Sequence, residues 1–425
     1  MKASMRLIDY LLTHNRYCSV FGIFIIFLLC WLFSYKRSAI KLRTVFAGLA
    51  LQMLTGFFVL KTELGYRILI GLVGIVDLLY QATEHGTRFI FGNLCDCSGP
   101  WGFIFAIRVL PVIVFFSAFT ALLFYFGIIQ RCVQGINYFL QPLIGTTGPE
   151  TACAIANSFL GQTEAPLVIR HYLSRMTESE LFVVMVSGMA TISGAILVVF
   201  VAMGVPAMHL LASSAMSIPG AIMIAKMLYP ETEKSFYSQQ QSVGDMDTGD
   251  KDIVLGSSVF EVIAKGTSDG LHMALIIGAM LIVFLAFLNS INGILSWFTV
   301  SVFGNGYALT LEKIVGVICT PCGYLLGFVG DEAFRIGELI GIKIAVNELV
   351  AYNQLLSLHL PERATSLVTY ALCGFSNFSC IGIQVGGIGL LVPEKRHIIA
   401  KLGIYAVFAG ALTNFLSALI VNLLI

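Results

Sequence analysis

Charged residues are scarce in this chain, and their scarcity limits what kind of protein it can be. Only 12% of its 425 residues are Asp, Glu, Lys or Arg, whereas 57% are hydrophobic, and the mean hydropathy is +0.88. A water-soluble domain of this length needs far more charged surface to stay dissolved. The composition therefore excludes an ordinary soluble protein and predicts one polytopic unit whose outer faces are covered by a lipid bilayer.

Clusters of functional side chains are also missing. The 25 lysines and arginines are spread between apolar blocks, so no basic patch points to nucleic acid as a partner. Seven histidines and ten cysteines form no metal-ligand set, and the short-spaced pair Cys319 and Cys322 stands alone. The sequence has no serine–histidine or nucleotide-binding motif. We therefore predict neither an enzyme nor a resident cofactor.

Apolar blocks that can cross a membrane recur along the chain. A spanning helix needs about 20 residues, and the shorter blocks reach this length with their flanks. No small-residue cleavage site follows the first block, which favours a retained helix over a signal peptide. The predicted crossings, about eight, are Val20–Phe33, Val45–Leu60, Phe103–Ile129, Leu181–Val205, His209–Leu228, Leu271–Leu288, Ser366–Val392 and Leu402–Ile425.

Two further stretches are polar enough to lie outside the bilayer core. Thr62–Gly92 is amphipathic with scattered charge, which favours a helix along the membrane surface. Tyr229–Ser258 is polar and acidic, and we predict a cytoplasmic connector between two halves of the protein. Short basic loops are typical of the cytoplasmic side. Most of them share one side if both termini face outward, although basic residues near the N-terminus favour the opposite orientation.

Two segments are too rich in glycine, proline and carboxylates to be simple spanning helices. They are Thr146–Tyr172, which contains Glu164, and Ile314–Tyr352, which contains Glu348. Irregular backbone at membrane depth is tolerated only where protein or a water-filled cavity satisfies its polar groups. Both segments are therefore predicted to be re-entrant hairpins that enter and leave the membrane on the same side.

The two predicted hairpins occupy matching positions in two halves of the chain. Each is followed by a polar hinge and then by an apolar helix with small polar residues in its middle, near Thr191 and Asn377 respectively. The spacings from the hairpin glutamates agree, since 191 − 164 = 27 and 377 − 348 = 29. Paired interrupted segments mark the binding site in transporters built from inverted repeats. The pattern therefore predicts a transporter.

These segments carry groups that suit a polar solute. A solute that leaves water needs a protein hydrogen bond for each of its polar groups. The Gln162 amide can both donate to and accept from the edge of a base, and Glu348 can accept from paired hydroxyls. Asn377 can bridge both, and Phe375 offers a flat apolar wall.

A monovalent cation needs oxygen ligands, and the same segments supply them. Asn157 and Thr191 carry side-chain oxygens, and the unwound carbonyls of Leu160 and Ile192 complete a candidate shell. Ordinary structural explanations stand beside these roles. Asn157 is also a preferred helix cap, and Thr191 also bonds well to its own helix.

The remaining candidates have ordinary explanations of the same kind. The two hairpin glutamates, Glu164 and Glu348, would also suit an exposed loop, although carboxylates inside a membrane are functional as a rule. Phe375 is also a normal packing residue.

Three motifs resemble the signatures of concentrative nucleoside transporters. They are Gly161–Pro166, Gly341–Tyr352 and Tyr370–Gly382, in the family's order, and the resemblance runs from about Phe103 to the C-terminus. It implies an all-α integral membrane fold with about eight transmembrane helices and two re-entrant helical hairpins in inverted repeats. It also implies a homotrimer in which an elevator-type transport domain slides against a scaffold.

The resemblance further implies roles for individual residues. The residues implied to contact the nucleoside are Gln162, Thr163, Glu164 and Phe375 at the base, Glu348 and Asn377 at the ribose, and Cys380 in the lining. The residues implied to bind Na⁺ are Asn157, Leu160, Thr191 and Ile192. Cys380 replaces the family's usual serine with a poorer hydrogen-bonding group, and Leu349 replaces the usual phenylalanine.

The expected organisation has five parts. They are residues 1–130 (N-terminal transmembrane helices and interfacial helix, scaffold), 131–230 (first repeat with hairpin 1, transport domain), 231–265 (polar cytoplasmic linker), 266–310 (scaffold helix and interfacial helix) and 311–425 (second repeat with hairpin 2, transport domain). We expect a multi-pass protein of the plasma membrane, the bacterial inner membrane, that imports nucleosides by sodium symport. Proton coupling is the near alternative, and a membrane enzyme or a passive channel is the alternative from another class.

Overall fold

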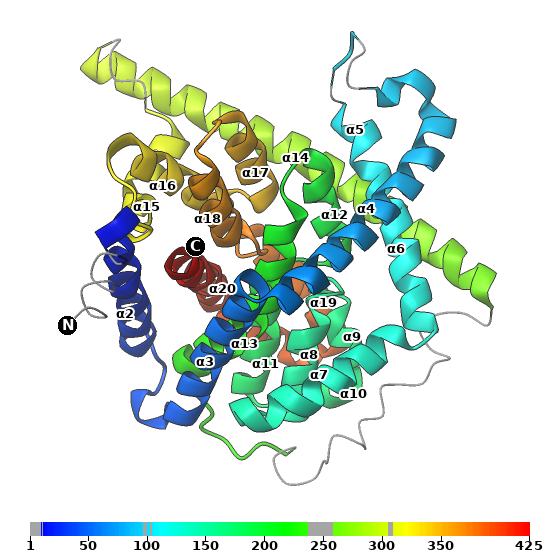
Figure 1. Cartoon of the computed structure of the whole chain (residues 1–425), viewed down its shortest axis with the longest axis vertical. Coiled ribbons are helices and arrows are strands. Elements are labelled where there is room, and N and C mark those ends of the chain that lie inside the picture. Colours follow the sequence, from blue (N-terminus) through cyan, green and yellow to red (C-terminus); the bar gives the residue numbers. More distant parts are fainter. Residues whose placement is uncertain (1–9, 11, 97–99, 103, 237–257, 305–308) are drawn as a thin grey trace.

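Helices form the whole of the described fold. The computed structural model describes residues 10, 12–96, 100–102, 104–236, 258–304 and 309–425, and within these ranges it contains helices and no strands (Figure 1). Seven helices are long and apolar enough to cross a membrane, or eight if one bent pair counts as a span. The prediction of an all-α integral membrane protein is confirmed.

The N-terminal part matches the expected crossings. Its helices are α2 (Arg16–Leu32), α3 (Leu42–Lys61), α4 (Glu63–Phe91), α5 (Phe105–Arg108) and α6 (Leu110–Tyr125), with 3-10 turns η1 (Thr13–Asn15), η2 (Arg37–Ala39) and η3 (Gly92–Cys95). The long helix α4 covers the stretch predicted to be an amphipathic helix. It begins at a cap, because the Thr62 hydroxyl accepts a hydrogen bond from the Gly65 amide at 3.1 Å.

The first repeat contains a short hairpin and a broken helix. Its helices are α7 (Ile128–Ile144), α8 (Gly148–Ala156), α9 (Ala165–Val168), α10 (Arg170–Leu173), α11 (Glu178–Ala190), α12 (Gly194–Met203) and α13 (Ala207–Leu228). We call the segment from α8 to α10 hairpin 1, and the pair α11 and α12 the first broken helix. The predicted interruption near Thr191 is confirmed, since the helix stops at Ala190 and restarts at Gly194.

The second half repeats this arrangement. Its helices are α14 (Val259–Phe303), α15 (Leu311–Leu325), α16 (Gly330–Ala345), α17 (Glu348–Ser357), α18 (Glu362–Leu372), α19 (Ser379–Leu391) and α20 (Arg396–Leu424), with the 3-10 turn η5 (Pro393–Lys395). Helix α14 extends well beyond the predicted crossing and begins inside the predicted linker 231–265. Most of that linker, residues 237–257, lies outside the described residues.

Two boundaries in the second half differ from the prediction. The range Ile314–Tyr352 is not one hairpin, because α15 and α16 form a separate pair bent by 116°. Pro321 lies inside α15 without breaking it, whereas Gly327 and Gly330 adopt positive φ angles that end the helix and start the next. The turn that carries Glu348 joins α16 to α17, and we call that pair hairpin 2.

The predicted crossing Ser366–Val392 is also two shorter helices, α18 and α19. They are separated by the irregular residues Cys373–Phe378, and neither reaches spanning length by itself. We call this pair the second broken helix. Its break is the interruption that the polar residues near Asn377 predicted.

Among the candidate membrane spans, the most buried are the first broken helix, α13 and α20. Helix α20 packs against α11, α13, α18 and α19, so it contacts both repeats. In the most apolar 18-residue stretch of the first broken helix, 89% of the residues are buried. In that of α14, which packs on α6 at the outside, only 6% are buried. The start of α2 contacts the end of α20, since Arg16 donates to the Ile425 carbonyl at 3.0 Å, and the two helices lie side by side in Figure 1. The outer face of α14 is thus left for lipid or another subunit.

Candidate functional site

The tip of hairpin 1 is docked on the first broken helix. The Gly194 amide, where α12 begins, donates to the Phe159 carbonyl in the tip at 3.2 Å. The Ser193 hydroxyl caps α12 through the Ile196 amide at 3.4 Å. The break therefore places free helix ends beside the irregular backbone of the tip, which is the arrangement that binds ions in transporters.

The four predicted cation ligands lie together at this junction. Asn157 is 1% exposed, and its amide nitrogen donates to the Cys153 carbonyl at 3.1 Å and to the Ser187 hydroxyl at 2.9 Å. Thr191 donates to the carbonyls of Ser187 at 2.8 Å and Asn157 at 3.3 Å. Both ordinary structural roles are therefore present.

Two neighbouring side-chain oxygens of the tip, Asn157 Oδ1 and Ser158 Oγ, are left over among the described residues. The Asn157 Oδ1 atom is buried and has no hydrogen-bond partner among the described residues. Leu160 and Ile192, whose carbonyls are the other predicted ligands, are both buried, and they lie three positions after Asn157 and directly after Thr191 respectively. Because a buried acceptor without a partner is costly, Oδ1 is the atom that a cation would satisfy.

Hairpin 2 meets the second broken helix in the same way. The Phe378 amide, at the start of α19, donates to the Ile344 carbonyl at the end of α16 at 3.3 Å. This bond corresponds to the one between Gly194 and Phe159 in the first repeat. The matching contacts support the predicted correspondence of the two halves.

A carboxylate and an amide face each other at this second junction. Glu348 is the first residue of α17 and is 7% exposed, and Asn377 is 1% exposed. The Asn377 amide nitrogen donates to Glu348 Oε2 at 2.8 Å. Its oxygen accepts from the Ser379 hydroxyl at 2.6 Å and from the Cys380 amide at 3.0 Å. Asn377 is thus held on both sides, and it fixes the position of the carboxylate.

Contacts across the repeats bring hairpin 1 to the same place. Gln384, on α19, donates to the Gln162 oxygen at 3.1 Å, and the Cys380 thiol faces the side chains of Gln162 and Asn377. Thr163 packs on Gly387, where a Cβ atom would meet its methyl group at 2.7 Å. Gln162, Thr163, Cys380, Asn377 and Glu348 therefore belong to one cluster.

Two predicted residues lie at the edge of this cluster. Phe375 is half-buried in the second break, and its backbone carbonyl accepts a hydrogen bond from the Asn377 backbone amide at 2.8 Å. Glu164 lines a separate cavity of about 240 Å³ between hairpin 1 and the helices α6 and α14, which Asp269 also lines. Its Oε2 atom accepts weakly from the Gly161 amide at 3.4 Å. Glu164 therefore faces the boundary with α6 and α14.

A buried lysine was not predicted as part of the site. Lys343, on α16, is 1% exposed and donates to the Asn414 oxygen at 2.7 Å and to the Ala371 carbonyl at 2.9 Å. Asn414, on α20, in turn donates to the Ala190 carbonyl at the end of α11 at 2.6 Å. The pair therefore joins hairpin 2 to both broken helices. A lysine within an apolar hairpin was the sequence signal that could have revealed it.

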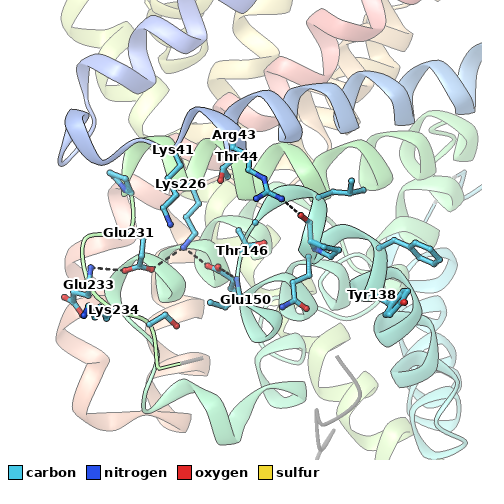
Figure 2. Close-up of a pocket in the computed structure, with 18 of the residues that line it drawn as sticks. Lys41, Arg43, Thr44, Tyr138, Thr146, Glu150, Lys226, Glu231, Glu233 and Lys234 are labelled. Carbon is cyan, nitrogen blue, oxygen red and sulfur yellow. Dashed lines mark hydrogen bonds and ion pairs between the residues drawn. The ribbon is translucent and has the colours of Figure 1, made fainter. Parts of the chain in front are cut away.

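A larger cavity than the one beside Glu164 lies elsewhere. It has a volume of about 1530 Å³, and basic residues of the α2–α3 loop and of α7 line it together with the segment after α13. Figure 2 shows Lys226 between Glu150 and Glu231, at 2.7 Å and 3.5 Å respectively. None of the predicted substrate or cation residues lines this cavity.

The ion pair between Lys226 and Glu150 gives a stability prediction. Glu150 is 1% exposed, so Lys226→Met leaves a buried carboxylate with only its bond from the Thr147 amide. We expect the free energy of unfolding to fall by about 2 kcal/mol, measured as a lower melting temperature of the purified protein. Adding Glu150→Gln should restore most of the loss, because it removes the unpaired charge.

The matched control is the exposed pair formed by Arg67 and Glu63, whose side chains are 74% and 78% exposed. Arg67→Met should change stability by less than about 1 kcal/mol. Equal changes in melting temperature for Lys226→Met and Arg67→Met would contradict a structural role for the buried pair.

Comparisons with known proteins identify the family. A model described as "Na+ dependent nucleoside transporter C-terminus" matches residues 209–422, and its N-terminal counterpart matches residues 21–94. A third model, described as "Nucleoside recognition", matches residues 106–207. The chain belongs to the Na⁺-dependent nucleoside transporter family. The resemblance drawn from the three motifs is thereby confirmed.

Relatives of this nucleoside transporter family match almost the whole chain. The nucleoside permease NupC of Helicobacter pylori is 39% identical, with 96% of this chain and 97% of that protein covered. The sodium/nucleoside cotransporter 2 of Rattus norvegicus is 34% identical, with 95% of this chain and 62% of that protein covered. These relatives are transporters and permeases, so the chain is a transporter and not an enzyme.

Solved structures of a nucleoside transporter agree with the fold. CNTnw in an inward-facing substrate-bound state is 38% identical, covers 96% of this chain and 97% of its own, and has a TM-score of 0.88. A variant of CNTnw in an outward-facing state is 37% identical, with coverages of 96% and 97% and a TM-score of 0.86. The chain is therefore a multi-pass membrane protein with the nucleoside transporter fold.

Proposed function

We propose that this protein imports nucleosides by sodium symport across the plasma membrane, which in bacteria is the inner membrane. The observation that carries the proposal is the meeting of two hairpin tips at two broken helices. Glu348 and Asn377 lie on one side of this cluster and Gln162 on the other, with Cys380 between them. A nucleoside has polar groups at both ends, which is what this arrangement can satisfy.

In this proposal the ribose lies at the carboxylate. Both oxygens of Glu348 can accept hydroxyl protons, and charge-assisted hydrogen bonds are about twice as strong as neutral ones. Glu348 is also the first residue of α17, where the helix dipole favours a negative charge. Asn377 holds Oε2 in place, and the base extends toward Gln162 and Thr163. Phe375 completes the predicted contacts with the base from the edge of the cluster, and Glu164 is proposed to approach the base from the cavity beside α6 and α14.

The coupling ion in this proposal is Na⁺ at the first junction. Asn157 Oδ1 is a buried acceptor without a partner among the described residues, and the Thr191 hydroxyl, which donates to the Asn157 backbone carbonyl, carries a second oxygen. The carbonyls of Leu160 and Ile192 complete the shell. The ion would join the tip of hairpin 1 to the first broken helix, so it would order Gln162 for the nucleoside.

The driving force is sufficient for accumulation. One cation that moves down about 100 mV releases about 2.3 kcal/mol, and a tenfold concentration gradient adds about 1.4 kcal/mol. Together these support accumulation of a neutral solute by roughly several hundredfold.

We further propose an elevator movement within a homotrimer. Helices α6 and α14 pack together at the outside, and the cavity beside Glu164 separates them from hairpin 1. A transport domain that contains both hairpins could slide along such a boundary. The division into scaffold and transport domain at residues 130, 230, 265 and 310 belongs to this proposal. The solved states of CNTnw, inward-facing, intermediate and outward-facing, support movement in a relative.

Uptake of labelled uridine into vesicles with imposed gradients tests the proposal. Uptake driven by a sodium gradient at equal pH is the expected result. Uptake that ignores sodium and follows a pH gradient would replace sodium with a proton, and uptake that never exceeds equilibrium would indicate a passive channel.

Removal of the unpartnered oxygen tests the cation site itself. Asn157→Ala should raise the sodium concentration for half-maximal uptake by about tenfold, because one buried oxygen ligand is lost. The matched control is Asn422→Ala, which removes an equally buried asparagine that bonds to Ser19 and to the Leu326 carbonyl. Asn422→Ala should leave the sodium dependence unchanged. An unchanged sodium dependence in Asn157→Ala would remove this residue from the site.

A further inference from the structure

Gln384 is a buried side chain for which neither the motif comparison nor the proposed function has a role. It lies on α19, is fully buried, and is in contact with hairpin 1 and with the first broken helix. Its amide nitrogen donates to the Met185 carbonyl at 2.9 Å and to the Gln162 oxygen at 3.1 Å. It therefore connects α11 to the residue proposed to contact the base.

The Met185 carbonyl determines which way the Gln384 amide points. A backbone carbonyl can only accept, so the Gln384 atom that faces it must be the nitrogen. The –NH₂ group has two hydrogens, and the second points to Gln162. Since the nitrogen can only donate there, the Gln162 atom that faces it must be the oxygen.

The orientation of Gln162 follows directly. Its oxygen is engaged by Gln384, so its own –NH₂ group is left for the site, where the Cys380 thiol lies beside it. A thiol is a weak acceptor that a ligand oxygen can displace. The hydrogen bonds that run from Met185 through Gln384 thus present Gln162 to the solute as a donor only.

One glycine, Gly188, leaves room for the side chains of Gln162 and Gln384. A Cβ atom on Gly188 would meet Gln162 Cβ at 2.8 Å and the Gln384 amide nitrogen at 3.1 Å. Gly188 lies one turn after Met185 on α11, so the carbonyl and the open space are on the same side of the helix.

We infer that Gln384 is a positioning residue that holds the Gln162 amide with its nitrogen toward the base, so that the transporter selects bases with a carbonyl where others have an amino group. The inference rests on the proposed function and adds a preference between nucleoside bases to it. A donor-only group pairs with a carbonyl oxygen, whereas an amino group in the same place leaves two donors facing each other.

The test uses uridine and cytidine, which carry a carbonyl and an amino group respectively at ring carbon 4, while the adjacent ring nitrogen is N–H in uridine and an acceptor in cytidine. We expect kcat/KM of the unaltered protein to favour uridine by about tenfold. Gln384→Met keeps the length of the side chain but frees Gln162 to rotate, so the ratio should approach one. Gln384→Glu can only accept when ionised, so it should turn the Gln162 oxygen toward the base and favour cytidine.

The matched control is Gln52→Met, which removes another fully buried glutamine whose amide donates to the Ser417 hydroxyl at 2.9 Å. It should leave the uridine-to-cytidine ratio unchanged, and this ratio does not depend on how much protein folds. An unaltered protein without a preference for uridine would overturn the inference. So would a Gln384→Met protein that keeps the original ratio or loses all uptake, because Gln384 is assigned orientation of the amide and no contact with the solute.

The inference and the proposed function fail in different ways. If the unaltered protein takes up neither nucleoside under any gradient, the proposed function is wrong and the inference falls with it. If it takes up both equally well, nucleoside transport stands and only the role of Gln384 is overturned.

Discussion

Glu348→Gln is expected to lower uridine uptake by at least about 100-fold while the protein still folds and inserts. The substitution keeps the size of the side chain but removes the charge, so two charge-assisted bonds to ribose hydroxyls become neutral, each weaker by about 1.5 kcal/mol. The remaining amide also presents a donor where the hydroxyls need an acceptor. Uptake of labelled uridine in vesicles, normalised to the amount of inserted protein, measures the effect.

Glu362→Gln is the matched control for this substitution. Like Glu348, Glu362 is the first residue of a helix, but it is exposed at the start of α18. Uptake by this variant should stay within about twofold of the unaltered protein, because an exposed charge at a helix start contributes little. Normal uptake by Glu348→Gln would show that the carboxylate does not hold the solute.

Lys343→Met is expected to weaken uridine binding by at least about 30-fold. The ammonium group donates to Asn414 and to the Ala371 carbonyl, and bonds from a charged donor contribute about 1.5–3 kcal/mol each. Without them Asn414 loses the partner that holds hairpin 2 against both broken helices. The carboxylate of Glu348, five positions further along the same hairpin, would then lose its fixed place. Saturation binding of labelled uridine to the purified protein measures the loss.

Lys395→Met serves as the control for a lost lysine. Lys395 also donates to two carbonyls, those of Leu173 and Met176, but it lies in a half-buried turn away from Asn414. Its loss should change uridine binding by less than about threefold, since only local loop contacts disappear. Equal losses in the two lysine variants would mean that Lys343 stabilises the fold without positioning the site.

Much of the site was predictable because it breaks the pattern of a membrane helix. Carboxylates, glycines and prolines in apolar segments marked both hairpins. Small and polar residues inside apolar helices marked the breaks near Thr191 and Asn377, and their spacing from the hairpin glutamates agreed. The structure brings Gln162, Cys380 and the pair of Glu348 and Asn377 into one cluster. Their roles in binding stay predictions.

The contacts that hold this cluster together were not predictable from the sequence. The partners Lys343 and Asn414 are 71 positions apart, and Gln162 and Gln384 are 222 positions apart. Periodicity describes one helix at a time and does not tell which side chains of different helices will meet. The extent of hairpin 2 was wrong for a local reason. Pro321 reads as a helix break, but α15 continues through it and ends only near Gly327.

A structure of the protein with uridine and sodium, determined by electron cryomicroscopy, tests the central claim most directly. We expect the nucleoside between the two hairpin tips, with its ribose on Glu348 and its base on Gln162, and the cation at Asn157. Uridine bound in the large cavity beside Lys226, or anywhere without contact to Glu348 and Gln162, would contradict it.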